Sequence, residues 1–137
     1  QPKYSMFERW VENDLLDVLE QEGAGCIPFS PLAQGMLTDK YLQGIPEDSR
    51  AGKKHGFLKE KDLTEERLGK IRALNGIAQT RRQTLAQMAL AWVLRDARVT
   101  SVLVGASRPE QLADSLKCLE NPSFSETELD QIGSILK

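Results

Sequence analysis

The chain has 137 residues, of which 40% are apolar and 28% charged, so its length and composition are those of one ordinary globular domain. Its 18 basic and 20 acidic residues give a formal charge of −2, whereas an electrostatically driven nucleic-acid binder normally carries a basic excess. No apolar run approaches the roughly 18 residues that a membrane span needs, and no secretory leader opens the chain, so we expect neither a nucleic-acid nor a membrane partner.

The first third of the chain predicts a loop, a helix and a short strand. Residues 1–5 have the character of a loop that follows an element absent from the sequence. Residues 7–22 predict an amphipathic helix, which Gly23 ends. Residues 24–30 are a short apolar run between turn residues, which is typical of a buried strand, although Pro28 weakens that interpretation. The apolar face of the helix comprises Trp10, Val11, Leu15, Val18 and Leu19.

The middle of the chain predicts a long loop followed by two helices. Three glycines and one proline interrupt residues 38–63, and loops of this length are usually functional or disordered. Within that loop, residues 53–55 read Lys-Lys-His and are expected at a solvated tip. Thr64 and the acidic residues after it favour a helix start. A second helix is expected from Thr84, with Met88 and Trp92 in a core-facing stripe.

The last third predicts a strand and two helices. Residues 99–104 are apolar and rich in β-branched side chains, which favours a strand. Ser107 and Glu110 have the spacing of a capping box, so a helix is expected from about residue 108 or 109 to about residue 119. Residues 125–128 open a final helix that runs through residue 135.

This order of elements predicts an α/β fold with parallel strands, because helices connect two apolar strands. Two strands are too few for a sheet, and a (β/α)8 barrel needs about 250 residues. Both facts indicate that the chain is part of a larger fold.

Small residues and a serine follow each predicted strand. Ser30 begins a sharp turn that ends at Gly35, and residues 105–107 lead directly into a helix. Such segments allow the backbone to approach a ligand closely, and exposed N–H groups at a helix start favour an anion. Neither segment matches the glycine-rich dinucleotide fingerprint. Ordinary turns, with Ser107 acting only as a helix cap, therefore remain the alternative.

Five spaced motifs together resemble the carboxyl-terminal half of an aldo-keto reductase. They cover nearly the whole chain, and they are most similar to the branch of bacterial glyceraldehyde-3-phosphate reductases and potassium-channel β subunits. The motifs are QPxYS at 1–5, FSPLAQG at 29–35, Lys-Tyr at 40–41, GIPxxSR at 44–50 and SVLVGASxxxQL at 101–112.

This resemblance implies that residues 1–137 form the C-terminal part of a single (β/α)8 TIM barrel that binds NADPH and reduces a small aldehyde such as a triose phosphate. It implies that Gln1 hydrogen-bonds the nicotinamide carboxamide, that Phe29 stacks on the nicotinamide ring, and that Lys40 and Arg50 bind the phosphates. The remaining implied cofactor positions are Ser30, Pro31, Leu32, Gln34 and Gly35 at the pyrophosphate, and Gly105, Ser107, Gln111, Asp114 and Ser115 around the adenosine and its 2′-phosphate. Ser30 and Ser107 are therefore expected to face one cleft.

The sequence departs from the family pattern in two respects. Asp114 and Ser115 stand where the family often has Glu-Asn, and Gln111 stands where many members have Arg, which bears on the preference for NADPH over NADH. The family's catalytic tetrad of Asp, Tyr, Lys and His precedes the position of Gln1. No catalytic residue is therefore expected within the chain. The 137-residue polypeptide alone, without its amino-terminal half, is expected to show no turnover and poor solubility, because an opened barrel leaves strand edges unpaired.

Other functions stay open at this point. A non-catalytic module that senses a nicotinamide cofactor or docks on a partner is the main alternative, and a homo-oligomer is compatible with either. An all-helical DNA-binding or scaffold domain is disfavoured by the balanced charge and the two strands. No metal site is expected, because His55 is the sole histidine, and the two cysteines favour a reducing cytoplasm. Arg81 and Arg82 are expected to favour a helix end through the helix dipole.

Overall fold

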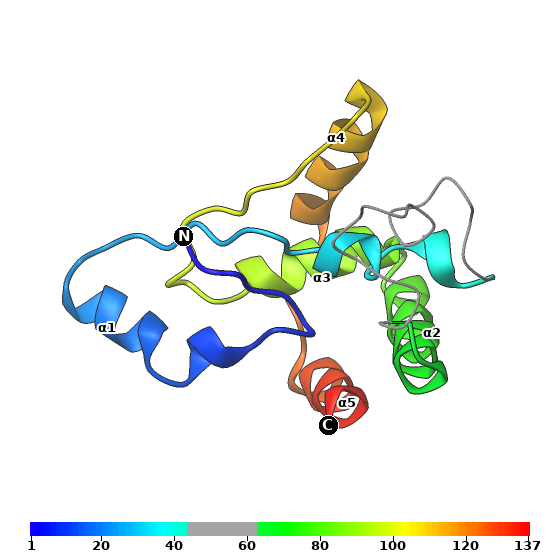
Figure 1. Cartoon of the computed structure of the whole chain (residues 1–137), viewed down its shortest axis with the longest axis horizontal. Helices are drawn as coiled ribbons and strands as arrows, with labels where there is room; N and C mark the ends of the chain where they lie inside the picture. The colour runs from blue at the N-terminus through cyan, green and yellow to red at the C-terminus, as the bar shows by residue number, and fades with distance from the viewer. Residues whose placement is uncertain (44–62) are drawn as a thin grey trace.

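The computed structural model describes residues 1–43 and 63–137, and helices dominate it (Figure 1). The α-helices are α1 (Leu15–Gln21), α2 (Glu65–Thr80), α3 (Leu85–Leu94), α4 (Pro109–Leu116) and α5 (Glu126–Leu136). Short 3-10 turns are η1 (Trp10–Glu12), η2 (Ala33–Gly35), η3 (Asp39–Tyr41) and η5 (Lys117–Glu120). None of the described helices combines the length and apolarity that crossing a bilayer requires.

Three extended segments, rather than two, lie side by side in parallel. Lys3 pairs with Phe29, and Cys26 pairs with Val99. The segment at 26–29 is therefore central, with residues 2–4 on one edge and residues 99–103 on the other. Its carbonyl groups at Cys26 and Pro28 accept from the N–H groups of Thr100 and Leu103, both at 2.9 Å. Within the described residues these contacts are isolated bridges, so the strands predicted at residues 24–30 and 99–104 do not form as continuous strands. Pro28 explains part of this because it has no N–H to extend the ladder.

Residues 1–5 form no named strand, in keeping with the predicted loop, but residues 2–4 pair with Phe29. The N–H of Phe29 donates to the carbonyl of Pro2 (3.0 Å), and the N–H of Tyr4 donates to the carbonyl of Phe29 (3.3 Å). The segment has little β-type patterning of its own, and its extended form comes from pairing with residues that lie about 25 positions away.

The helix predicted over residues 7–22 is shorter and interrupted. Ser5 and Glu8 exchange two backbone hydrogen bonds of 3.0 and 3.1 Å, which hold residues 5–8 in a tight turn and delay the helix. Asp14 then leaves helical geometry with φ −146° before α1 begins. The predicted apolar face is accordingly broken, since Trp10 and Val18 are half exposed while Leu16 is buried.

The predicted starts of α2, α3 and α5 are confirmed by their caps. Thr64 accepts from the N–H of Arg67, which fixes the first turn of α2. Thr84 and Gln87 form a complete capping box on α3, and Ser125 and Glu128 form another on α5. Each cap satisfies backbone N–H groups that the first turn of a helix leaves without partners.

The capping box predicted for Ser107 and Glu110 is wrong. Arg108 occupies the N-cap of α4 and makes no side-chain cap bond, while Pro109 supplies the fixed φ of the first helical residue. The helix also ends at Leu116, and η5 takes over the residues that were expected to continue it.

Helix α3 lies at the centre of the core. All its residues except Ala86 and Leu94 are buried, including the predicted core residues Met88 and Trp92. The Trp92 ring lies 5.7 Å from the Tyr4 ring, which joins α3 to the first extended segment. The core covers one side of the extended segments, because Cys26 and Val99 are buried whereas Ile27, Phe29 and Leu103 are more than 40% exposed. The architecture is thus a partial α/β layer, with helices on one face.

Candidate functional site

A cavity of about 810 Å³ opens where the second and third extended segments end. One wall is the turn from Ser30 to Gly35 with the following η3, and the opposite wall is the stretch from Leu103 into α4. The start of α3 contributes Thr84 and Ala86 to its lining. Ser30 and Ser107 therefore face one cavity, as the sequence predicts.

The Ser30–Gly35 wall has an unusual backbone. Ser30, Ala33 and Gln34 have positive φ values of 56°, 47° and 61°, a region that residues other than glycine seldom occupy. Hydrogen bonds hold the turn in this form. The N–H of Ala33 donates to the carbonyl of Ser30 and the N–H of Gly35 to the carbonyl of Leu32, both at 2.9 Å. Backbone strain of this kind is concentrated at ligand sites, where the surrounding contacts maintain it.

Hydrogen bonds fix the α4 wall from within. The side-chain oxygen of Gln111 accepts from the N–H of Ser107 (2.9 Å) and from its hydroxyl (3.1 Å). The hydroxyl of Ser115 donates to the carbonyl of Gln111 at 2.9 Å. Ser107 thus acts as a partner of Gln111 rather than as a helix cap, so the loop before α4 is tied to the first turns of the helix.

Gln87 connects α3 to this wall, and our sequence reasoning missed it. Its buried side-chain amide donates to the Asp114 carboxylate at 2.8 Å, while its oxygen accepts from the N–H of Thr84 at 3.0 Å. The signal was present in the sequence, because Thr84 and Gln87 have capping-box spacing. The contact with Asp114, 27 residues away, follows only from the tertiary arrangement.

The cavity's charges are mixed. Among the described residues its lining includes one cation, Lys40, and three carboxylates, those of Asp39, Glu110 and Asp114. Lys117 lies 3.9 Å from the Asp114 carboxylate and offsets part of its charge. Among the described residues, the groups that this cavity offers to an anionic ligand are therefore Lys40 and backbone and hydroxyl donors.

The cavity brings together most of the predicted site residues. Gln1 and Phe29 are not in the lining. The Phe29 side chain is 43% exposed on the face of the extended segments that lies away from the core. Its backbone pairs with that of Lys3. Arg50 and the Lys-Lys-His stretch at 53–55 lie outside the described residues. The predicted residues that line the cavity are Ser30, Pro31, Leu32, Gln34, Gly35, Lys40, Gly105, Ser107, Gln111, Asp114 and Ser115.

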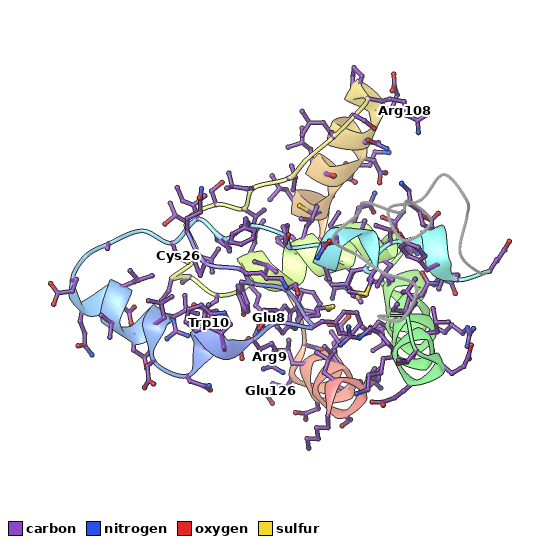
Figure 2. The ribbon with its side chains drawn as sticks, viewed as in Figure 1. Glu8, Arg9, Trp10, Cys26, Arg108 and Glu126 are labelled. Atoms are coloured by element: carbon purple, nitrogen blue, oxygen red, sulfur yellow. The ribbon has the colours of Figure 1, made fainter. Side chains whose placement is uncertain are left out.

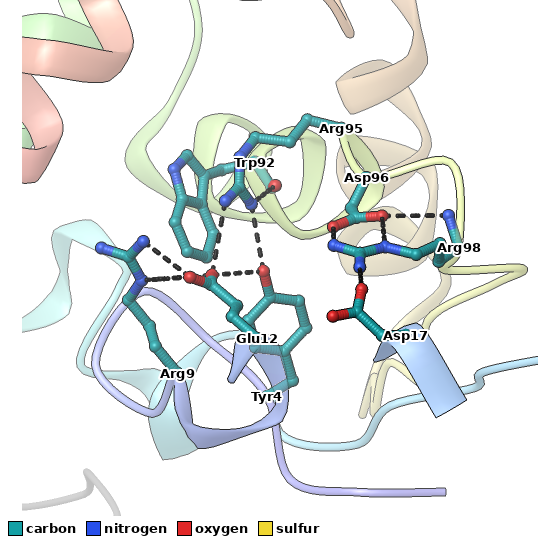
Figure 3. Close-up of polar contacts among 8 residues, drawn as sticks. All are labelled: Tyr4, Arg9, Glu12, Asp17, Trp92, Arg95, Asp96 and Arg98. Carbon is teal, nitrogen blue, oxygen red and sulfur yellow. Dashed lines mark hydrogen bonds and ion pairs between the residues drawn. The ribbon is translucent and has the colours of Figure 1, made fainter. Parts of the chain in front are cut away.

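A second polar cluster, which the sequence did not predict, joins Tyr4 and η1 to the C-terminal end of α3 (Figure 3). The buried Tyr4 hydroxyl donates to the Glu12 carboxylate at 2.7 Å, and Arg95 donates to both groups at 3.1 and 3.3 Å. The Arg95 guanidinium lies 3.6 Å from the Trp92 ring centre. Arg9 adds a two-pronged contact with Glu12, at 2.7 and 3.1 Å.

This cluster shifts the proton affinities of its members in opposite directions. Burial raises the pKa of the Tyr4 hydroxyl well above its usual range. Burial also acts to raise the pKa of Glu12, but hydrogen bonds from Arg9 and Tyr4 and the charges of Arg9 and Arg95 hold it below its ordinary value. The cluster therefore keeps an ionised carboxylate between two arginines, and it ties the first extended segment to α3.

Arg81 lies at the C-cap of α2, the helix end that the sequence predicts, and its side chain makes further contacts. Its side chain is almost fully buried, donates to the carbonyls of Asn121 and Ser123 (both 2.9 Å) and pairs with Glu128 at 2.7 Å. Its guanidinium lies 3.8 Å from the Phe124 ring centre. It therefore anchors the segment before α5, a task that goes beyond favouring a helix dipole.

Comparisons with known proteins agree on one family. The model of the aldo/keto reductase family matches residues 1–137. The L-glyceraldehyde 3-phosphate reductases of Escherichia coli O157:H7 and K12 are 57% and 55% identical over 136 residues, covering 96% of this chain and 39% of each relative. A solved glycerol dehydrogenase of Gluconobacter oxydans superposes with a TM-score of 0.77 at 26% identity, covering 98% of this chain and 40% of that one. The chain thus spans about two-fifths of the length of the proteins that it matches.

Proposed function

The chain belongs to the aldo/keto reductase family, and from this premise we propose that it is the cofactor-binding portion of an NADPH-dependent reductase acting on a small aldehyde. The observation that carries the proposal is the shared cavity, because the Ser30–Gly35 turn and the Ser107–Ser115 stretch line one space. Its volume of about 810 Å³ suits a ligand of nucleotide size. The names of the E. coli relatives support a phosphorylated triose as the aldehyde.

The cavity residues fit the chemistry of a dinucleotide. The strained turn at Ser30–Gly35 lines the cavity, and its small residues Ser30 and Gly35 would let the backbone approach a pyrophosphate closely. Lys40 on η3 would neutralise phosphate charge from the same side, and Arg50 is proposed as a second cation. At the other wall, Gln111, Asp114 and Ser115 offer donors and acceptors for an adenosine and its 2′-phosphate.

The nicotinamide end of the ligand is proposed to lie toward the extended segments. Phe29 exposes its ring on the side away from the helical core, and its pairing with Lys3 places the first residues of the chain beside it. Stacking on that ring would fix one face of the nicotinamide, and Gln1 would orient its carboxamide. When bound, the cofactor supplies the hydride. The described residues orient it, and the cavity walls restrict water.

We also propose that the proton comes from a tyrosine outside these 137 residues, in the amino-terminal part of a single barrel domain. The polypeptide of 137 residues would then bind cofactor but not turn over aldehyde. The same proposal places the protein in the cytoplasm, in keeping with two buried cysteines, Cys26 and Cys118, that remain unpaired.

Titration of the 137-residue chain with NADPH, followed by cofactor fluorescence, tests this proposal. Lys40→Gln should weaken binding about ten- to hundredfold, as expected for a lost charge-assisted hydrogen bond of about 1.5–3 kcal/mol. Lys70→Gln removes the same charge from α2, outside the cavity lining, and should leave binding unchanged. No NADPH binding by the folded chain, or equal losses in both variants, would contradict the assignment. A parallel titration with NADH reports how much the 2′-phosphate contributes.

A further inference from the structure

The orientation of two glutamine side chains decides which polar groups the α4 wall presents to the cavity. A glutamine amide has an accepting oxygen and a donating nitrogen, and a backbone N–H can only donate, so a backbone N–H fixes which end of the amide faces it. At Gln111 the oxygen accepts from the N–H and the hydroxyl of Ser107, at 2.9 and 3.1 Å. The NH2 group of Gln111, a donor, is therefore the end presented to a ligand, and it suits a phosphate oxygen.

Gln87, at the start of α3, is oriented in the same way. Its oxygen accepts from the N–H of Thr84 at 3.0 Å in the capping box, so its NH2 group must point away from the cap. That group donates to the Asp114 carboxylate at 2.8 Å and to the Asp114 carbonyl at 3.3 Å. Because the cap leaves only a donor on this side of Gln87, residue 114 has to supply an acceptor.

This contact is a direct constraint on the Asp114 side chain. Figure 2 shows Arg108 at the outer end of α4, away from the helical body, whereas Asp114 is near the other end of the helix. Gln87 donates to Oδ1 of Asp114, and Lys117 lies 3.9 Å from the same oxygen. Both partners thus approach one side of the carboxylate. Its side chain is 44% exposed and lines the cavity, so Oδ2 is the oxygen left for a ligand.

A carboxylate oxygen in this cavity restricts which part of a dinucleotide can lie beside it. The oxygen repels phosphate and accepts only from an N–H or O–H group. Asp114 lies three residues beyond Gln111 on α4, and residues at that spacing are neighbours on one helix face. If the donor of Gln111 faces the 2′-phosphate, the group next to it at Asp114 is the adenine base, whose donor is its 6-amino group.

We propose that Gln87 is a positioning residue of the cofactor site. Through Oδ1 of Asp114 it holds Oδ2 where that oxygen accepts from the 6-amino group of adenine, and it thereby favours a 6-aminopurine over a 6-oxopurine. Gln87 is not among the described residues that line the cavity, so it acts through Asp114 and not by touching the ligand. This inference rests on the proposed function for the identity of the ligand, and it adds the base preference and the residue that sets it.

Paired titrations of the 137-residue chain with NADPH and with its reduced hypoxanthine analogue test the inference. The two dinucleotides share the nicotinamide whose fluorescence reports binding. They differ at one edge of the purine, where in the analogue an oxygen replaces the 6-amino group and N1 carries a hydrogen. The wild-type chain should bind NADPH about tenfold more tightly, as expected for one hydrogen bond to a half-exposed carboxylate.

Gln87→Glu should lower this preference to less than about twofold. Glutamate serves in a capping box as well as glutamine does, so the bond to Thr84 is kept, but the new carboxylate repels Asp114 instead of donating to it. The double variant Q87E/D114N should recover most of the preference, because an amide at position 114 donates to the new carboxylate and keeps its oxygen for the base. A merely structural role of Gln87 predicts no such recovery.

The matched control is Gln79→Glu, which adds the same charge at an exposed position of α2 outside the described lining and should keep the wild-type preference. Circular dichroism shows whether the helices persist in each variant. Four results would overturn the inference: a wild-type preference near one, an unchanged preference in Gln87→Glu, an equal loss in Gln79→Glu, or no recovery in the folded double variant.

A titration with NADH separates the base from the ribose. If Gln87→Glu changes the ratio of NADPH to NADH affinity more than it changes the base preference, Asp114 lies at the ribose and the inference is wrong. Failure of the folded wild-type chain to bind either NADPH or its analogue would refute the proposed function and this inference with it. NADPH binding with a base preference that does not depend on Gln87 would refute this inference alone.

Discussion

Helices α3 and α4 both line the same cavity, yet they differ in burial and in capping. Helix α3 is apolar around most of its circumference, has a complete capping box, and buries eight of its ten residues. Helix α4 has no side-chain cap bond and no buried residue, and its leucines face outward. One wall is thus part of the core, whereas the other depends on local hydrogen bonds and leaves its leucines exposed. The two walls of one cavity are therefore held in place by different interactions.

The largest difference should appear when one large apolar side chain is removed from each helix. Trp92→Ala empties a fully packed position and removes the contacts with Tyr4 and Arg95, so we expect a loss of about 3–5 kcal/mol in the free energy of unfolding. Leu116→Ala should change it by no more than about 0.5 kcal/mol, because that side chain is mostly in solvent. Urea unfolding followed by circular dichroism measures both. Similar losses would mean that α4 is covered in solution.

Replacement of the buried Arg81 should give the next largest loss in the free energy of unfolding. Arg81→Ala leaves the Ser123 carbonyl and Glu128 Oε1 without their donor and removes one of the two donors to the Asn121 carbonyl, and we expect a loss of about 3 kcal/mol. The neighbouring Arg82 is exposed and has φ 57°, so Arg82→Gly should be neutral or stabilising by up to about 1 kcal/mol. Thermal unfolding of the two variants compares them. A stable Arg81→Ala protein would show that α5 is held by its apolar contacts alone.

The decline of the unfolding free energy at acid pH distinguishes Glu12, in the cluster with Tyr4 and Arg95, from an exposed carboxylate. The folded pKa of Glu12 lies below its ordinary value of 4.5, so its contribution is fully present above about pH 4.5 and is lost as the pH falls through the folded value. Glu12→Gln should therefore lose about 1–3 kcal/mol at pH 7 and show a flatter decline in unfolding free energy between pH 5 and about pH 2. Glu22→Gln, at an exposed position after α1, should keep the wild-type slope. An unchanged slope in Glu12→Gln would contradict the assignment of the ion cluster.

The smallest expected difference in unfolding free energy is between variants at the starts of α3 and α4. Thr84→Ala removes a working cap from α3 and should lose about 1 kcal/mol. Ser107→Ala removes only a hydroxyl that bonds Gln111, while the backbone N–H of residue 107 keeps its bond to the same oxygen, so the loss should stay below about 0.5 kcal/mol. Chemical unfolding of matched samples resolves the two. Equal losses would restore Ser107 to the role of a helix cap.

Much of the helical structure could be predicted from local sequence. Thr64, Thr84 and Ser125 each mark a helix start, because a cap bond joins residues three positions apart and needs no tertiary partner. The same reasoning failed at Ser107, where Gln111 competes successfully for the hydroxyl. It also did not reveal the pairing of residues 2–4 with Phe29. Local spacing does not reveal a competing partner or a distant strand.

Some features of the candidate site could likewise be predicted from the sequence, and others could not. Resemblance indicated the Ser30–Gly35 turn and the Ser107–Ser115 stretch, and both line the cavity. The amide of Gln87 on Asp114, and the burial of Arg81 against Phe124, could not be anticipated because the partners are 27 and 43 residues apart. A long polar side chain can reach many positions, and only the packed arrangement selects one of them.

By itself the sequence determined the family, the starts of the capped helices and the apolar character of α3, since each of these depends on residue type at short spacing. Tertiary structure decided which turns share a cavity, which arginine is buried, and which leucines of α4 remain exposed. The physical reason is that burial and long-range hydrogen bonds require two segments to meet in space, whereas a local sequence pattern reports only on residues that are close along the chain.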